Sequence, residues 1–100
     1  MQAISYEITA IVRGDLTAKF ESYMTERHIP DVIATGAFES STFLRSGEGR
    51  YRISYLTSRE GLDGYLREQA PALRAHVAES FPEGVEISRE EWEVLSVFTE

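Results

Sequence analysis

The stretch from His28 to Phe38, HIPDVIATGAF, contains the residues of this sequence that are best suited to chemistry. An imidazole titrates near pH 7, so His28 suits proton transfer, and the carboxylate of Asp31 suits orienting that ring. Thr35 offers a hydroxyl group to a ligand. A structural interpretation also stays open for each residue: His28 as the cap at the end of a helix, Asp31 as a turn former, and Thr35 as part of a loop.

Aromatic side chains and a second histidine complete the set of candidates. Tyr55 and Trp92 lie in segments expected to be strands. Such residues pack in cores or interfaces, but in a cavity they stack on a flat organic ligand. We predict a ligand site formed by His28, Asp31, Thr35, Tyr55 and Trp92. For His76, a place near the apolar stripe of a helix favours a partly buried structural residue.

Several classes of site are disfavoured by composition. The chain has no cysteine, and its two histidines lack the spacing of paired metal ligands, so we predict no metal site and no cofactor. The net charge of −7 disfavours nucleic acid and anionic membranes as partners. There is no leader-like N-terminus and no apolar stretch of about 18 residues, so we expect a cytoplasmic protein.

Strands are predicted where apolar and polar residues alternate. The first strand covers residues 3–12, with Ile4, Tyr6 and Ile8 on one face. Two further strands, 39–46 and 51–57, flank a glycine-containing hairpin turn at 46–50. Residues 85–98 are predicted to be extended, with a break or bulge in the charged run at 88–91.

Two helical segments separate these strands. The first begins near Leu16 and should end near His28, because Pro30 disfavours helical geometry in the residue before it. An irregular loop through Gly36 follows. The second helix starts after the capping residue Ser58 and is interrupted by Pro71, so we expect a kink or two pieces.

The resulting order of elements is strand, helix, strand, strand, helix, strand. It predicts an α+β, ferredoxin-like βαββαβ fold in a single domain, residues 1–100. Its four-stranded antiparallel sheet carries two helices on one face and leaves the other face open.

The motif HIPDV-x-ATG-x-F resembles a small uncharacterised bacterial family, a domain of unknown function. YEIT at 6–9, APALR at 70–74 and FPEGVEISREEWEVL at 81–95 extend the resemblance over nearly the whole chain. The family is similar to the dimeric α+β barrel proteins, in which two ferredoxin-like units pack their open sheet faces together. Its pattern carries a histidine before APALR, where this chain has Gln69, so the resemblance assigns no role to a second histidine.

The resemblance implies a homodimer with an interface pocket. Ile11 and Leu56 on the open sheet face, and apolar residues on both sides of 85–98, support a second copy as the cover of that face. Two functions remain: a small-molecule-binding protein, either a cofactor-free enzyme or a ligand sensor, with a pocket near His28, or a non-catalytic dimerisation module. Catalysis itself is left open.

Overall fold

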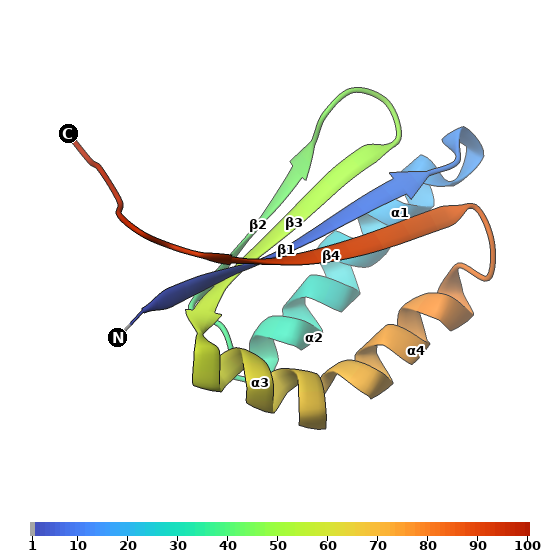
Figure 1. The fold of residues 1–100 in the computed structure, drawn as a ribbon. Coiled ribbons are helices and arrows are strands. Elements are labelled where there is room, and N and C mark those ends of the chain that lie inside the picture. Colours follow the sequence, from blue (N-terminus) through green and yellow to red (C-terminus); the bar gives the residue numbers. More distant parts are fainter. Residues whose placement is uncertain (1) are drawn as a thin grey trace.

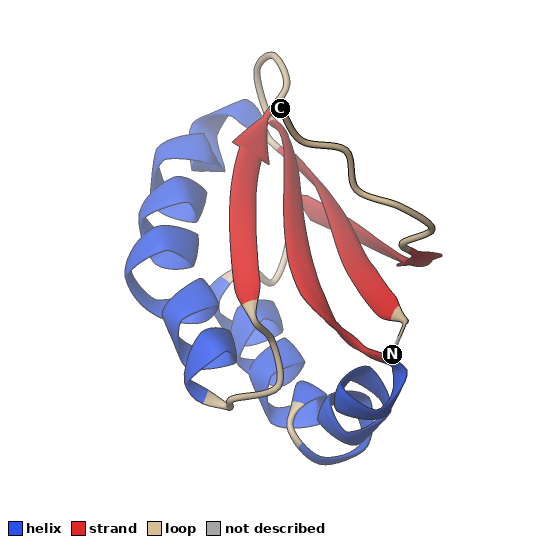
Figure 2. Cartoon of the chain, turned by 90° about the vertical axis from the view of Figure 1, so that its left-hand side faces the viewer, coloured by secondary structure: helices blue, strands red, loops and turns tan. Residues whose placement is uncertain are grey.

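The computed structural model describes residues 2–100. Four antiparallel strands form one sheet in the order β2-β3-β1-β4, and the helices cover one of its faces (Figures 1 and 2). This arrangement confirms the predicted α+β ferredoxin-like fold. The strands are β1 (Ala3–Val12), β2 (Ser40–Arg45), β3 (Arg50–Ser58) and β4 (Val85–Glu93), and the helices are α1 (Thr17–Tyr23), α2 (Ile29–Ala34), α3 (Arg59–Glu68) and α4 (Ala70–Ser80).

Alternation along the two central strands sorts their side chains between the faces of the sheet. On β1, Ile4 and Tyr6 point into the core, where Tyr6 lies opposite Tyr55 of β3. Phe20 of α1 and Leu62 of α3 pack against these strands and are completely buried. The space between helices and sheet is therefore filled mainly by aromatic and branched side chains.

The first helical segment runs further than predicted. A π-helical turn, Met24–His28, joins α1 to α2, and the helix ends only at Ala34, with Thr35 as its C-cap. Pro30 lies in the first turn of α2 and does not stop the helix. A proline removes one hydrogen bond and crowds the carbonyl four residues back, and the wider π turn before it absorbs that distortion. His28 therefore lies within a continuous helix, and its interpretation as a helix cap is wrong.

The second helical segment matches its prediction. Ser58 caps α3, since its Oγ accepts a hydrogen bond of 3.0 Å from the amide of Gly61. The segment divides at Gln69, and Pro71 sits in the first turn of α4, where a missing amide hydrogen costs nothing. Leu62, Tyr65 and Val77 form the buried face of the two pieces.

The last strand is shorter and more regular than predicted. Its register with β1 is unbroken from Val85 to Glu93, so the bulge expected at 88–91 is absent from the strand. β4 is an edge strand, where long charged side chains on the helix side still reach solvent. The ladder ends near Ala3, the first residue of β1, whose carbonyl accepts the amide of Val94 at 2.9 Å.

The seven residues after β4 run away from the body of the molecule (Figure 1). Leu95, Val97 and Phe98 are 85%, 76% and 91% exposed. The prediction of one strand over 85–98 with two apolar faces is therefore wrong. In the described part of the chain, no helix is long and apolar enough to cross a membrane.

Candidate functional site

A small cavity lies between the helical layer and the sheet. Its volume is about 30 Å³, enough for a group the size of one or two water molecules. Apolar side chains, including those of Phe20 and Ile53, form much of its wall. Six polar side chains, each from a different segment, also line it: Tyr6, His28, Tyr55, Tyr65, Arg74 and Arg89.

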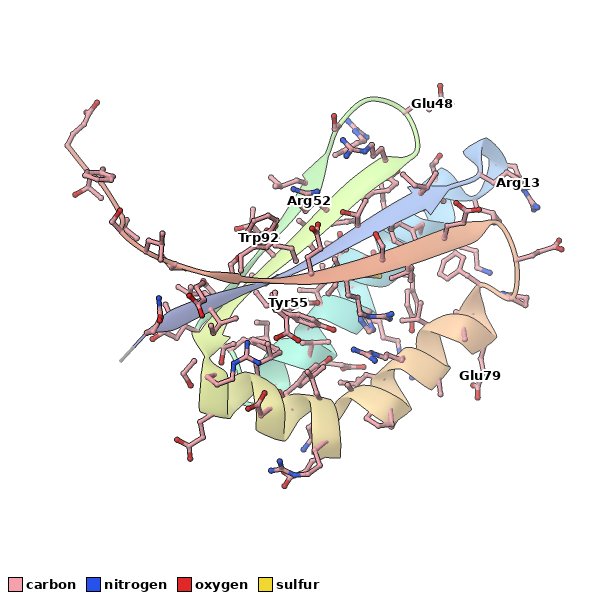
Figure 3. All side chains as sticks on the ribbon, in the orientation of Figure 1. Arg13, Glu48, Arg52, Tyr55, Glu79 and Trp92 are labelled. Carbon is pink, nitrogen blue, oxygen red and sulfur yellow. The ribbon has the colours of Figure 1, made fainter. Side chains whose placement is uncertain are left out.

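Tyr55 is a deeply buried polar group of the cavity wall, 1% exposed. Its hydroxyl lies near that of Ser41, the residue opposite it on β2, and neither of these two hydroxyls makes a hydrogen bond of normal geometry among the described residues. Figure 3 shows the side chain between the sheet and the helices. Burial raises the pKa of this phenol well above its usual value, so the group stays protonated at neutral pH. A buried hydroxyl without a partner is costly to folding and is available to a ligand.

Two further phenols lie beside Tyr55. The ring centroid of Tyr6 is 6.2 Å from that of Tyr55 and 6.4 Å from that of Tyr65. Arg74 Nη2 donates a hydrogen bond of 2.8 Å to Tyr6 Oη, which fixes the guanidinium at the cavity. Burial raises the pKa of Tyr65 to about 12. The hydroxyl of Tyr65 therefore stays protonated at neutral pH and can donate a hydrogen bond.

His28 reaches the cavity from the π turn. Burial lowers its pKa to about 4, against the opposing charge of Asp31, and the charges of His76 and Arg89 lower it further. The imidazole is therefore neutral at pH 7, with one nitrogen to donate and one to accept a hydrogen bond. Tyr23 stacks on His28 with ring centroids 6.1 Å apart. Its hydroxyl lies 2.6 Å from Nδ1 of His76, so the second histidine has a structural partner outside the cavity wall.

The structure brings together two of the five predicted site residues, His28 and Tyr55. Asp31 is exposed and does not line the cavity. The Oγ of Thr35 donates to the carbonyl of Val32 at 2.7 Å and completes the end of α2. Trp92 is 56% exposed on the opposite face of the sheet, together with Arg52 (Figure 3). The expected cavity with His28 between two open sheet faces is wrong in its location, because His28 lies on the helix side.

Sequence reasoning missed the two arginines of the cavity. Arg89 falls on the inward side of β4 by strict alternation with Ile87, a signal that the expected bulge obscured. Arg74 precedes Val77 by three residues and Phe81 by seven, which is the spacing of one helix face. Among residues 2–100, no three His, Asp or Glu side chains gather where they could hold a metal ion.

Comparison with known protein families identifies the family of this sequence. A family described as "Domain of unknown function (DUF4286)" matches residues 3–95. The chain belongs to this family. A search of proteins with curated functions gave no match.

Three solved structures share the fold of this DUF4286 chain. A protein of unknown function from Nitrosomonas europaea is 18% identical, with a TM-score of 0.72 over 100% of this chain and 96% of the other. A proposed antibiotic biosynthesis monooxygenase from Caulobacter crescentus is 20% identical, with a TM-score of 0.70 over 95% and 92%. The heme-degrader MhuD from Mycobacterium tuberculosis, solved with two hemes in its active site, is 21% identical, with a TM-score of 0.73 over 96% and 99%. At these identities the likeness concerns the fold.

Proposed function

We propose that this protein binds a small organic molecule at the cavity between its helices and its sheet. The observation that carries the proposal is the hydroxyl of Tyr55, which is buried and protonated and which, although the hydroxyl of Ser41 lies near it, makes no hydrogen bond of normal geometry among the described residues. In native proteins the large majority of buried polar side-chain atoms have a hydrogen-bond partner. A ligand that hydrogen-bonds to this hydroxyl would satisfy it.

The surroundings of Tyr55 support the same proposal. Polar side chains from six segments converge on the cavity, and one of them, His28, comes from a π turn. Turns of this kind inside helices are frequent at functional sites. The polar groups lie against aromatic rings, the combination that fixes both the orientation and the body of an organic ligand.

The size of the cavity limits the ligand. Sites for drug-sized molecules measure about 300–1,000 Å³, which is about ten to thirty times the space of about 30 Å³ here. Only a small head group of a ligand can therefore enter the cavity, and a ligand as large as the hemes of MhuD does not fit within its present walls. The cavity therefore does not indicate a heme-dependent reaction.

Turnover and sensing are both compatible with such a site. His28 presents a neutral imidazole that can accept a proton, as a cofactor-free enzyme requires. A sensor needs only that binding changes stability or association. The proposal therefore commits to binding, and a turnover assay follows once a ligand is known.

A thermal-shift screen tests the proposal. The panel contains phenols, quinones, aromatic acids and heme, and the matched variants are Tyr55→Phe and Tyr51→Phe. Tyr51 lies on the same strand, but its hydroxyl is satisfied by Glu21 at 2.6 Å. A binder should stabilise the wild type and Tyr51→Phe, and stabilise Tyr55→Phe at least several-fold more weakly. Equal binding by all three proteins would refute the role of Tyr55.

Dimerisation through the open sheet face is a second candidate function. Ile11, Leu44 and Trp92 are 45%, 48% and 56% exposed on that face. We propose that a second copy covers them, which gives a homodimer whether or not a ligand binds. Light scattering coupled to size exclusion should then give about twice 11.3 kDa, and Trp92→Lys should shift the mass toward the monomer. A monomeric wild type at micromolar concentration would contradict this proposal.

A further inference from the structure

Arg74 and Arg89 carry positive charge to the cavity without a carboxylate partner. Five other arginines of the chain form ion pairs, whereas neither of these two does so within residues 2–100. No acidic side chain among the described residues lines the cavity either. Both arginines are exposed, so solvent screens part of their charge, but no carboxylate in the described part of the cavity wall offsets it.

The two guanidinium groups act on the same space, although they come from different elements. Both line the cavity, Arg74 from α4 and Arg89 from β4. Burial raises the pKa of Tyr65, and the positive charges of both arginines lower it. The charge of Arg89 also lowers the pKa of His28. With His28 neutral and Tyr55 and Tyr65 protonated, the two guanidinium groups give the cavity wall a net positive charge at pH 7, which favours an anion.

An apolar groove continues from the cavity along α4 and β4. Its volume is about 180 Å³, and its walls include Val77, Phe81 and Ile87. It shares both arginines with the cavity, so the two guanidinium groups stand where the polar cavity meets the apolar groove. Even together, the two spaces are smaller than the site of a drug-sized ligand.

We propose that the site takes a small monocarboxylic acid, with its carboxylate on Arg74 and Arg89 and its apolar body in the groove. The carboxylate then receives charge-assisted hydrogen bonds from the guanidinium groups and can accept one from the hydroxyl of Tyr55. The inference rests on the proposed function and adds the class of ligand to it.

Phenylacetate and its neutral amide, phenylacetamide, test the inference on the wild-type protein by NMR titration. The two probes have the same apolar body and differ in charge. Phenylacetate should bind about tenfold to a hundredfold more tightly and shift the amide signals of α4 and β4. Its affinity should fall as salt is added, because the attraction is electrostatic.

Arg89→Gln and Arg50→Gln provide the matched pair of variants. Arg50 also lacks an ion pair within residues 2–100, but it does not line the cavity. Arg89→Gln should lose at least tenfold in phenylacetate affinity, and Arg50→Gln should keep the wild-type value. Equal affinity for the acid and the amide, or an unchanged Arg89→Gln, would overturn the carboxylate inference. If a neutral fragment still shifted the NMR signals of the cavity residues, the proposed function would stand. If no fragment shifted them, that function would be refuted as well.

Discussion

Replacing Tyr55 by phenylalanine should make the protein more stable. The substitution removes one oxygen atom from a side chain that is 1% exposed and whose hydroxyl, although near that of Ser41, makes no hydrogen bond of normal geometry among the described residues. An unsatisfied buried polar group costs roughly 1–3 kcal/mol. The cavity beside it, about 30 Å³, can admit water and reduce that cost. We therefore expect a gain of about 1 kcal/mol, which is about 4–8 °C in melting temperature for a domain of this size.

Thermal and urea denaturation of the wild type, Tyr55→Phe and Tyr51→Phe measure this gain. Tyr51→Phe is the control, because its hydroxyl donates to Glu21 Oε2 at 2.6 Å and its loss should destabilise by about 1 kcal/mol or more. If Tyr55→Phe lowered the melting temperature as Tyr51→Phe does, the reasoning would be refuted. The hydroxyl would then be well satisfied in the folded protein and would not be free for a ligand.

Three further predictions concern the core, a buried histidine and a turn. Phe20→Ala should cost about 3–5 kcal/mol in a urea melt, because Phe20 is completely buried; a loss under about 1 kcal/mol would contradict its place in the core. Burial lowers the pKa of His28 from 6.5 to about 4, so between these values the unfolded chain binds a proton that the folded chain does not. The free energy of unfolding should fall as pH drops through this window, by on the order of 3 kcal/mol, and His28→Gln should lack this part of the pH dependence. Gly49→Ala should destabilise clearly more than Gly47→Ala: both glycines have positive φ, but a Cβ on Gly49 would lie 2.6 Å from the carbonyl oxygen of Val12, while a Cβ on Gly47 meets nothing within 4 Å. Equal melting temperatures for these two variants would show that the close approach is relieved.

Alternation and capping made most of the fold predictable. The first strand and the cap at Ser58 follow from local sequence, since strand periodicity and a capping hydroxyl act over a few residues. The break at Pro71 is local in the same sense. Family membership also agrees with the resemblance, whereas the weight of the HIPDV-x-ATG-x-F motif within the family stays a prediction.

The errors arose where the local rule for proline met a tertiary constraint. Pro30 predicts a helix end, but Met24 in the π turn and Val32 in α2 both pack against the core, which keeps the segment in one helix. His28 consequently points into the space beneath the sheet. The role of Arg74 could not be read from sequence alone, because its contact with Tyr6 joins residues 68 positions apart.

Mapping bound fragments onto the structure by NMR tests the central claim most directly. Amide and side-chain signals of the wild-type protein would be followed during titration with the binders from the thermal-shift panel. A site between helices and sheet predicts that the largest shifts fall on Tyr55, His28 and Tyr65, the side chains that line the cavity. Shifts confined to the open sheet face around Trp92, or the absence of any fragment that shifts the cavity residues, would contradict the claim.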